Sequence, residues 1–298
     1  MPIMNVTVIG AGTMGNGIAQ VFAMNNYNVT LCDISSDALN KALNNVRTNL
    51  ERMAKKGLIA DSEISKSINK IKTTTSITEG VKSADLIIEA ASENIKVKED
   101  IFKLIDKEAP LHCILASNTS SISITQIAAV TLRPEKVIGM HFMNPVPVMK
   151  LIEVIRGYAT TDEVCHIIMQ LSKAIQKVPV AVNDYPGFVA NRILMPMINE
   201  SIYTLFEGIA GVGEIDTVMK LGMAHPMGPL ALADFIGLDV CLSILNIMHE
   251  GFGNPKYAPC PLLVNMVVAG KLGKKSGEGF YQYIEGSKDI SISKKFLN

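Results

Sequence analysis

The chain has 298 residues, of which 48% are hydrophobic and 19% are charged. This length predicts about two domains, and the composition is that of a globular protein and not of a disordered one. Lysine plus arginine and aspartate plus glutamate both number 28, so the formal net charge is zero. A neutral chain has no long-range field that would attract nucleic acid or an anionic membrane, and we expect neither as a partner.

The cysteine pattern and the N-terminus predict a cytoplasmic protein. The five cysteines are scattered, and no C-x-x-C motif occurs. A disulfide framework and a thiolate metal site are therefore not expected, as in proteins of reducing compartments. No apolar run reaches the length of a membrane span, and the first residues lead directly into a predicted strand without room for a signal peptide.

A glycine-rich loop follows the first predicted strand. Residues 5–9 form a β-branched run, and a helical pattern extends through residue 24. A second strand at 28–32 ends in Asp33, and this spacing is typical of dinucleotide-binding sites. Glycine loops are common by themselves, so it is the order strand, loop, helix and strand that indicates a cofactor. The loop reads Gly10-Ala11-Gly12-Thr13-Met14-Gly15.

Each part of this loop has a predicted task in binding a dinucleotide. Gly10 permits the tight turn, Gly12 lets the backbone approach a pyrophosphate, and Gly15 lets the helix pack on the strand. Thr13 and Met14 lie at the N-terminus of the helix, whose amides point toward the phosphates.

Asp33 predicts which cofactor is bound. Its carboxylate would accept hydrogen bonds from both ribose hydroxyls and would repel a 2′-phosphate. The residues that follow, Ile34-Ser35-Ser36, include no arginine that could hold such a phosphate. We therefore predict NAD and not NADP. The alternative is a tight turn that binds no ligand.

Two predicted helices stand where a single crossover helix would suffice. Residues 36–56 and 61–70 both have helical patterns, and Gly57 marks the end of the first. This predicts an inserted helical hairpin, which could be a solvated face or a site for an acidic substrate handle such as a nucleotide phosphate. The basic residues on its first arm and tip are Arg47, Arg52, Lys55 and Lys56.

Polar clusters follow two further predicted strands. A strand at 84–88 is followed by Glu89 and by Ser92-Glu93-Asn94, and a strand at 114–116 is followed by Ser117-Asn118-Thr119-Ser120-Ser121. Each cluster alone could be an ordinary helix cap. With the glycine loop they predict the edge of a cleft, because open α/β sheets bind ligands at the carboxyl ends of their strands.

A histidine and a glutamate occupy neighbouring predicted strands. Residues 137–140 form an apolar strand that ends at His141, and residues 151–155 form another that carries Glu153. Prolines at 145 and 147 impose an extended or turning backbone between them. A carboxylate beside an imidazole can hold one ring nitrogen while the other accepts a proton. The alternative is a core histidine beside a surface acid.

The pattern of the chain changes near residue 184. Before it, strands alternate with helices, which predicts an α/β Rossmann-type domain over residues 1–184, with a mostly parallel sheet and the inserted hairpin. After it, helical spacing prevails, which predicts an all-α domain over residues 185–298. The polar tail 285–298 is expected to fray. The second domain should contain helices at 188–206, 213–221, 229–235, 238–249 and 261–268, and a strand at 279–281.

Several motifs together resemble the 3-hydroxyacyl-CoA dehydrogenase family. The resemblance covers residues 4–284, and the chain looks most similar to the short bacterial 3-hydroxybutyryl-CoA dehydrogenases. The motifs that carry it lie at residues 10–15, 88–90, 93–94, 117–121, 141–151, 186–192, 225–230 and 234–239.

The resemblance implies a role for each candidate site residue. His141 is the catalytic base and Glu153 its partner, while Ser120 and Asn191 bind the reacting oxygen of the substrate. Lys56 and Arg52 on the hairpin are placed against the coenzyme A nucleotide. The residues expected to line the cofactor, in addition to the glycine loop and Asp33, are Glu93, Lys98, Asn118, Ser120 and Asn144.

The implied activity is the NAD-dependent interconversion of an (S)-3-hydroxyacyl-CoA, specifically 3-hydroxybutyryl-CoA, with its 3-oxoacyl-CoA, which is then acetoacetyl-CoA. A neutral imidazole takes the hydroxyl proton while the cofactor takes the hydride. Family members pair through the C-terminal half, so a homodimer or a dimer of dimers is expected. The alternatives are a dehydrogenase of the same fold that acts on a free hydroxy acid, and a non-catalytic NAD-binding protein.

Overall fold

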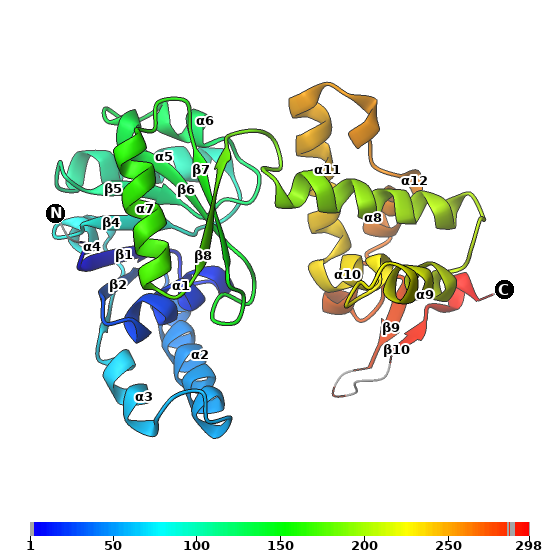
Figure 1. Ribbon diagram of the computed structural model, residues 1–298, viewed down its shortest axis with the longest axis horizontal. Coiled ribbons are helices and arrows are strands. Elements are labelled where there is room, and N and C mark those ends of the chain that lie inside the picture. The colour runs from blue at the N-terminus through cyan, green and yellow to red at the C-terminus, as the bar shows by residue number, and fades with distance from the viewer. Residues whose placement is uncertain (1–2, 285, 287–289, 298) are drawn as a thin grey trace. The chain divides into compact units, whose positions relative to one another are not determined.

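Two compact units make up the structure, a computed structural model that describes residues 3–284, 286 and 290–297 (Figure 1). The first unit covers Met1–Tyr185 and the second Pro186–Asn298. The sequence predicts this boundary at residue 184. Each unit buries a hydrophobic core of its own.

An eight-stranded sheet forms the centre of the first unit, in the order β3-β2-β1-β4-β5-β6-β7-β8. Neighbouring strands are parallel except for β6 and β7, which pair antiparallel. The predicted Rossmann-type, mostly parallel sheet is thereby confirmed. The strands are β1 (Asn5–Ile9), β2 (Asn28–Cys32), β3 (Ile71–Thr74), β4 (Leu86–Glu89), β5 (Ile114–Ser117), β6 (Val137–Phe142), β7 (Leu151–Arg156) and β8 (Val178–Asn183).

The central strands are buried along their whole length. Every residue of β4, β5 and β6 is buried, which explains why these segments read as continuous apolar runs. Their parallel pairing brings the carboxyl ends of β1, β4, β5 and β6 to one edge of the sheet. Polar residues that follow these strands in the sequence therefore meet at that edge.

Helices connect the strands of the first unit. Polar side chains cap the N-termini of α2 and α5: Ser35 accepts a hydrogen bond from Ala38 N, and Asn94 accepts one from Val97 N. The sequence does not predict α4 or α6, because five residues are too few to establish a helical period. The helices are α1 (Thr13–Met24), α2 (Ser36–Lys55), α3 (Asp61–Ile68), α4 (Ile77–Val81), α5 (Ile95–Glu108), α6 (Ile124–Ala128) and α7 (Asp162–Ala174).

The helices α2 and α3 form the predicted inserted hairpin. Gly57 follows α2 with a φ of +69°, a conformation that favours glycine, and its amide donates to Ala54 O at 2.8 Å. The residues of α2 that face the core recur at helical spacing and are Leu39, Ala42, Val46 and Leu50.

The second unit is helical, as predicted, but it also contains a two-stranded sheet. The predicted helices are all present, with bounds shifted by at most a few residues. Among the described residues no single helix is long and apolar enough to cross a membrane. The helices α10 and α11 together have that length and apolar character, but they are bent by 95° at their junction. The elements are α8 (Ala190–Phe206), α9 (Val212–Gly222), α10 (Pro229–Ile236), α11 (Leu238–Phe252), α12 (Pro261–Val268), β9 (Tyr281–Tyr283) and β10 (Ile290–Ile292).

The C-terminal tail corrects two expectations. The predicted strand at 279–281 lies at 281–283, and the prediction of a frayed tail is wrong for residues 290–297, because β10 pairs antiparallel with β9. Ser293 N donates to Phe280 O at 3.0 Å, and the Phe296 ring packs at 5.8 Å from the Phe280 ring. The anchor is the buried carboxylate of Asp234, which accepts from Phe280 N and Tyr281 N. Burial raises the pKa of Asp234 to about 6, although the hydrogen bonds from these two amides act to lower it.

Candidate active site

The glycine loop turns sharply between β1 and α1. Gly10 has a φ of +103°, and a Cβ there would lie 2.5 Å from Ala90 O. A Cβ on Gly15 would lie 1.7 Å from Gly10 O. The protein's own backbone therefore requires both glycines. Gly12 differs, because a Cβ there would meet nothing within 4 Å and would project into open space.

Asp33 lies directly after β2, and main-chain amides orient its carboxylate. Its Oδ2 accepts a hydrogen bond from Ala11 N at 2.8 Å, and its Oδ1 accepts one from Ser35 N at 2.9 Å. The first of these bonds ties the acid to the glycine loop, so that both parts of the predicted dinucleotide site have a fixed relative position.

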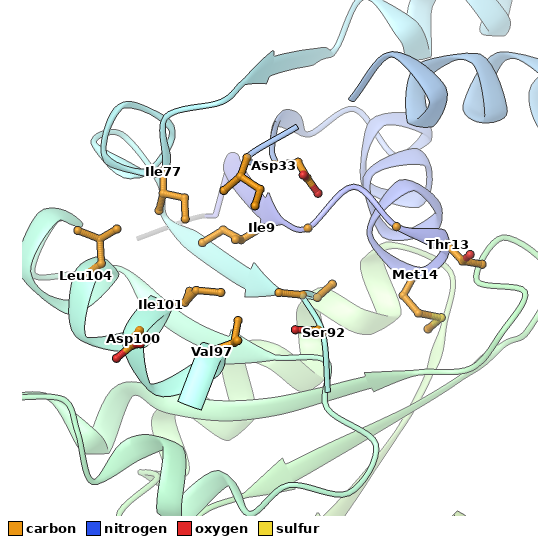
Figure 2. Close-up of a pocket in the computed structure, with 15 residues that line it drawn as sticks. Ile9, Thr13, Met14, Asp33, Ile77, Ser92, Val97, Asp100, Ile101 and Leu104 are labelled. Carbon is orange, nitrogen blue, oxygen red and sulfur yellow. The ribbon is translucent and has the colours of Figure 1, made fainter. Parts of the chain in front are cut away.

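A cavity of about 760 Å³ opens beside the glycine loop and Asp33 (Figure 2). Figure 2 shows Val97 and Ile101 of α5 across the cavity from Asp33. An apolar wall beside a fixed acid suits an adenine and its ribose, and the open space at Gly12 suits a pyrophosphate, so the residues present fit NAD. The walls are formed by Gly10, Gly12, Thr13, Met14 and Asp33, with the apolar side chains of Ile34, Ile77, Val97, Ile101 and Leu104.

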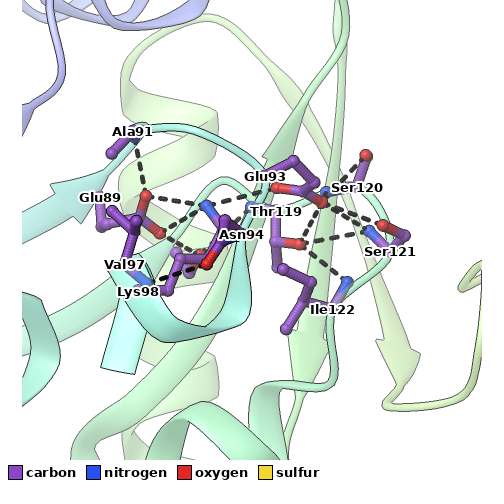
Figure 3. Close-up of polar contacts among 11 residues, drawn as sticks. Glu89, Ala91, Glu93, Asn94, Val97, Lys98, Thr119, Ser120, Ser121 and Ile122 are labelled. Carbon is purple, nitrogen blue, oxygen red and sulfur yellow. Dashed lines mark hydrogen bonds and ion pairs between the residues drawn. The ribbon is translucent and has the colours of Figure 1, made fainter. Parts of the chain in front are cut away.

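A buried lysine joins two carboxylates next to this cavity. Lys98 Nζ lies 2.8 and 3.0 Å from the two carboxylate oxygens of Glu89 and 3.3 Å from Glu93 Oε2 (Figure 3). The side chains of Lys98 and Glu89 are 1% and 0% exposed. Glu89 also accepts hydrogen bonds from Ser117 Oγ at 2.6 Å and from Ala91 N at 2.7 Å. The group thus links the end of β4 to α5 and β5.

Glu93 accepts several hydrogen bonds from the loop that follows β5. Its Oε1 accepts from Thr119 Oγ1 at 2.6 Å, from Ser120 N at 2.9 Å and Ser120 Oγ at 3.2 Å, and from Ser121 N and Oγ at 3.2 and 3.1 Å. Burial opposes ionisation of Glu93, but the Lys98 ammonium and these donors outweigh it, so its pKa lies below the ordinary value. Ser120 is therefore positioned by an anionic carboxylate (Figure 3).

Two asparagines predicted to line the cofactor occupy different settings. Asn118 Oδ1 accepts a hydrogen bond from Phe142 N at 2.9 Å, and Asn118 N donates to Glu89 O at 2.7 Å. Its side-chain oxygen thus joins the ends of β5 and β6. Asn144 lies just after β6 and is exposed.

His141 and Glu153 face each other across the antiparallel pair β6 and β7. They are directly opposite in the register, which places both side chains on one face of the sheet. His141 Nδ1 lies 2.8 Å from Glu153 Oε2, and the two residues are 8% and 2% exposed. His141 lies inside β6, one residue before its end, where the sequence predicts the strand to stop. The structure thus brings together the two residues of the predicted pair.

Three further predicted site residues belong to other elements of the chain. Arg52 is exposed in the last turn of α2, and Lys56 caps that helix. No ion pair among the described residues involves either side chain. Asn191 belongs to the second unit, where it is buried in the first turn of α8.

Sequence reasoning did not assign a role to Glu89. The available signal was a charged residue at the end of an otherwise apolar strand, since such a residue is rarely buried without a partner. The partner, Lys98, lies on a different element and becomes evident only in the fold. In the described part of the chain, no three His, Cys, Asp or Glu side chains are placed to hold a metal ion.

Replacing Gly12 and Gly15 by alanine should separate cofactor binding from folding. Gly12→Ala places its methyl group in open space at a φ of −66°, so the melting temperature should stay near that of the wild type while NADH binding weakens about tenfold or more. Gly15→Ala meets backbone and should lose about 1–3 kcal/mol of stability or more. Calorimetric titration with NADH and thermal unfolding make the comparison. Unchanged NADH affinity in Gly12→Ala would contradict the prediction that the pyrophosphate binds against this loop.

Asp33 should determine the preference for NADH over NADPH. Its fixed carboxylate repels a 2′-phosphate, so the wild type should use NADH at least tenfold more efficiently than NADPH, a difference of about 1.4 kcal/mol. Asp33→Ala should narrow this ratio. Initial rates with each cofactor at matched concentrations measure it, and equal efficiency of the wild type with both would contradict the role given to Asp33.

Comparisons with known proteins agree with this geometry. The model of the 3-hydroxyacyl-CoA dehydrogenase NAD-binding domain matches residues 5–185, and that of the C-terminal domain matches residues 187–283. A probable 3-hydroxybutyryl-CoA dehydrogenase of Bacillus subtilis is 54% identical over 96% of this chain and 99% of its own length.

Solved structures give the same result. A crystal structure of (S)-3-hydroxybutyryl-CoA dehydrogenase from Ralstonia eutropha is 48% identical, has a TM-score of 0.92, and is matched over 95% of this chain and 100% of that chain. A diketoreductase that acts on dicarbonyl compounds is 31% identical, with a TM-score of 0.83 and the same coverage. The chain therefore belongs to the 3-hydroxyacyl-CoA dehydrogenase family, and it is an NAD-dependent oxidoreductase.

Proposed function

We propose that the chain interconverts (S)-3-hydroxybutyryl-CoA and acetoacetyl-CoA with NAD as the redox partner. The observation that carries this proposal is the 2.8 Å contact between His141 Nδ1 and Glu153 Oε2. This contact orients a buried imidazole, and the same unit contains the cavity whose residues fit NAD. The names of the relatives from Bacillus subtilis and Ralstonia eutropha support this choice of substrate.

His141 acts as the acid and base of this reaction. With the Nδ1 proton donated to Glu153, the lone pair on Nε2 accepts the proton of the substrate hydroxyl. Glu153 then balances the positive charge of the imidazolium, as a carboxylate does in other histidine pairs. When bound, NAD supplies the hydride acceptor. In the direction of reduction, the imidazolium returns the proton to the oxygen of the substrate.

Ser120 and Asn191 bind the reacting oxygen in this proposal. Support for Ser120 comes from the network of Glu93, which holds both its amide and its hydroxyl. Asn191 lies in the first turn of the long helix α8 in the second unit, where it is buried. Glu93, Lys98 and Asn144 line the nicotinamide end of the cofactor.

The basic end of the hairpin favours a coenzyme A thioester. Arg52 and Lys56 lie near the end of α2, and neither is neutralised by an ion pair among the described residues. Phosphates of a nucleotide are suitable partners for such cations. A free hydroxy acid would leave this end of the hairpin without a ligand.

The relative that acts on dicarbonyl compounds keeps a second candidate open, namely a dehydrogenase of a substrate without coenzyme A. Rates of NADH oxidation with acetoacetyl-CoA and with acetoacetate at equal concentrations distinguish the two. The proposal expects turnover of the thioester to exceed that of the acid by about 100-fold or more, because the acid lacks the binding energy of the nucleotide. Equal rates would favour the second candidate, and no turnover of either would indicate a protein that binds NAD without this activity.

Substitutions at 141 and 153 should separate the base from the residue that orients it. His141→Gln removes proton transfer, so kcat should fall by about 10²–10⁴-fold while NADH binding is retained. Glu153→Gln keeps the hydrogen bond but not the charge, so kcat should fall and the acid limb of the pH profile for oxidation should move to lower pH. Steady-state kinetics from pH 5 to 9 measure both effects. An unchanged rate in His141→Gln would contradict the proposed base.

We also infer that the protein is a cytoplasmic homodimer or dimer of dimers that assembles through the second unit. The five cysteines are all buried and free, which fits a reducing compartment. The second unit exposes many large apolar side chains, and such surfaces often mark subunit interfaces. Those on or next to α8 and α9 include Ile193, Phe206, Ile209, Val218 and Leu221.

Light scattering tests this assembly. The wild type at micromolar concentration should have at least twice the chain mass of 32.2 kDa. Leu221→Asp with Val218→Asp should shift it toward monomer, whereas Leu132→Asp should not, because that leucine, although 97% exposed, belongs to the first unit. A monomeric wild type would contradict the inference.

A further inference from the structure

Lys177 is a buried cation that the proposed mechanism does not use. It is 8% exposed and immediately precedes β8. Its Nζ donates to Val146 O at 2.6 Å and to Met149 O at 2.7 Å. Among the described residues it forms no ion pair, and burial lowers its pKa. An ammonium held by two carbonyl oxygens alone is an unusual use of a buried charge.

Both carbonyl groups belong to the loop 143–150, which connects β6 to β7 and so lies between His141 and Glu153. A two-residue hairpin fixes its own geometry, but a loop of this length does not. Inside the loop, Val148 N and Met149 N both donate to Pro145 O. These bonds shape the turn without attaching it to the rest of the unit.

Contacts with residues outside the loop attach it to the rest of the unit. Lys177 holds two of its carbonyl groups, and the amide of the next residue, Val178, donates to Lys150 O at 2.8 Å. On the side of α1, Val146 is 2% exposed and packs so close to Gly17 that a Cβ there would lie 2.9 Å from Val146 Cβ. Among these contacts, Lys177 contributes the charged side chain. Its positive charge strengthens the two hydrogen bonds that it donates.

We propose that Lys177 is a positioning residue, whose ammonium clamps the loop 143–150 and thereby holds Asn144 and the ends of the strands that carry His141 and Glu153. This inference rests on the proposed function for its effect on catalysis. The clamp itself is a property of the fold and can be measured without turnover. Its loss should therefore loosen the loop and lower kcat, while the cavity beside the glycine loop stays intact.

Lys177→Met removes the donors and the charge at similar length, and Lys177→Arg keeps both. Lys136→Met is the matched control, since Lys136 Nζ also donates to a carbonyl, Leu111 O at 2.6 Å, but outside the loop. Lys177→Met should lower kcat by about 10- to 100-fold with a change of KM below about threefold, Lys177→Arg should recover most of the loss, and Lys136→Met should match the wild type. If Lys177→Met does not fold, Lys177→Gln takes its place in the comparison with Lys177→Arg and Lys136→Met.

A single tryptophan reports the loop independently of activity. The chain contains no tryptophan, and Val148 in the loop is 72% exposed, so Val148→Trp introduces one fluorophore at the clamped segment. In that background Lys177→Met should increase quenching by acrylamide and lower the anisotropy, and Lys136→Met should leave both unchanged.

The two readouts separate the clamp from the function. Absence of turnover in the wild type, with the expected change in quenching, would refute the proposed activity and keep the clamp. Unchanged quenching in Lys177→Met, or a wild-type kcat in that variant, would overturn the inference. An equal loss of kcat in Lys136→Met would overturn it too, because the effect would then not depend on the loop.

Discussion

A buried ammonium between two carboxylates determines the arrangement of the candidate site. Lys98 on α5 contacts Glu89 at the end of β4 and Glu93 in the segment that follows. Because a buried charge without its partner costs about 3–5 kcal/mol, Lys98 and Glu89 cannot move independently of each other, and the same ammonium attracts the more exposed Glu93. Through Glu93 this constraint extends to Ser120 in the loop after β5. Two loops that are separate in the sequence therefore take their positions from one charge.

The reversed direction of β7 has a comparable effect on the other side of the site. Pairing antiparallel with β6, it places Glu153 directly opposite His141. A parallel strand would reach this edge only after a long crossover connection. Here the loop 143–150 makes the antiparallel connection, and the contacts of Lys177 supply an anchor for it. The proposed catalytic pair and the clamp proposed for its loop are thus consequences of the same strand reversal.

Features that depend on local pattern were predictable from the sequence. The glycine loop, Asp33, the helical hairpin and the helix at 95–108 all follow from residue types at short spacing, and the structure contains each of them. Contacts between distant residues were not predictable in this way. Ser117 meets Glu89 across 28 positions, and Lys177 meets Val146 across 31. The C-terminal strand pair was missed because its anchor, Asp234, lies 46 positions before Phe280.

The tautomer of His141 tests the central claim most directly. Proton abstraction by His141 requires the proton of the neutral ring to reside on Nδ1, donated to Glu153, so that Nε2 carries the lone pair. Nitrogen-15 NMR of the protein with labelled histidine distinguishes the two forms, and the spectrum of His141→Gln identifies the signal among the five histidines. The predicted result for the neutral ring is a protonated Nδ1 and an unprotonated Nε2. A proton on Nε2 and none on Nδ1 would contradict the account.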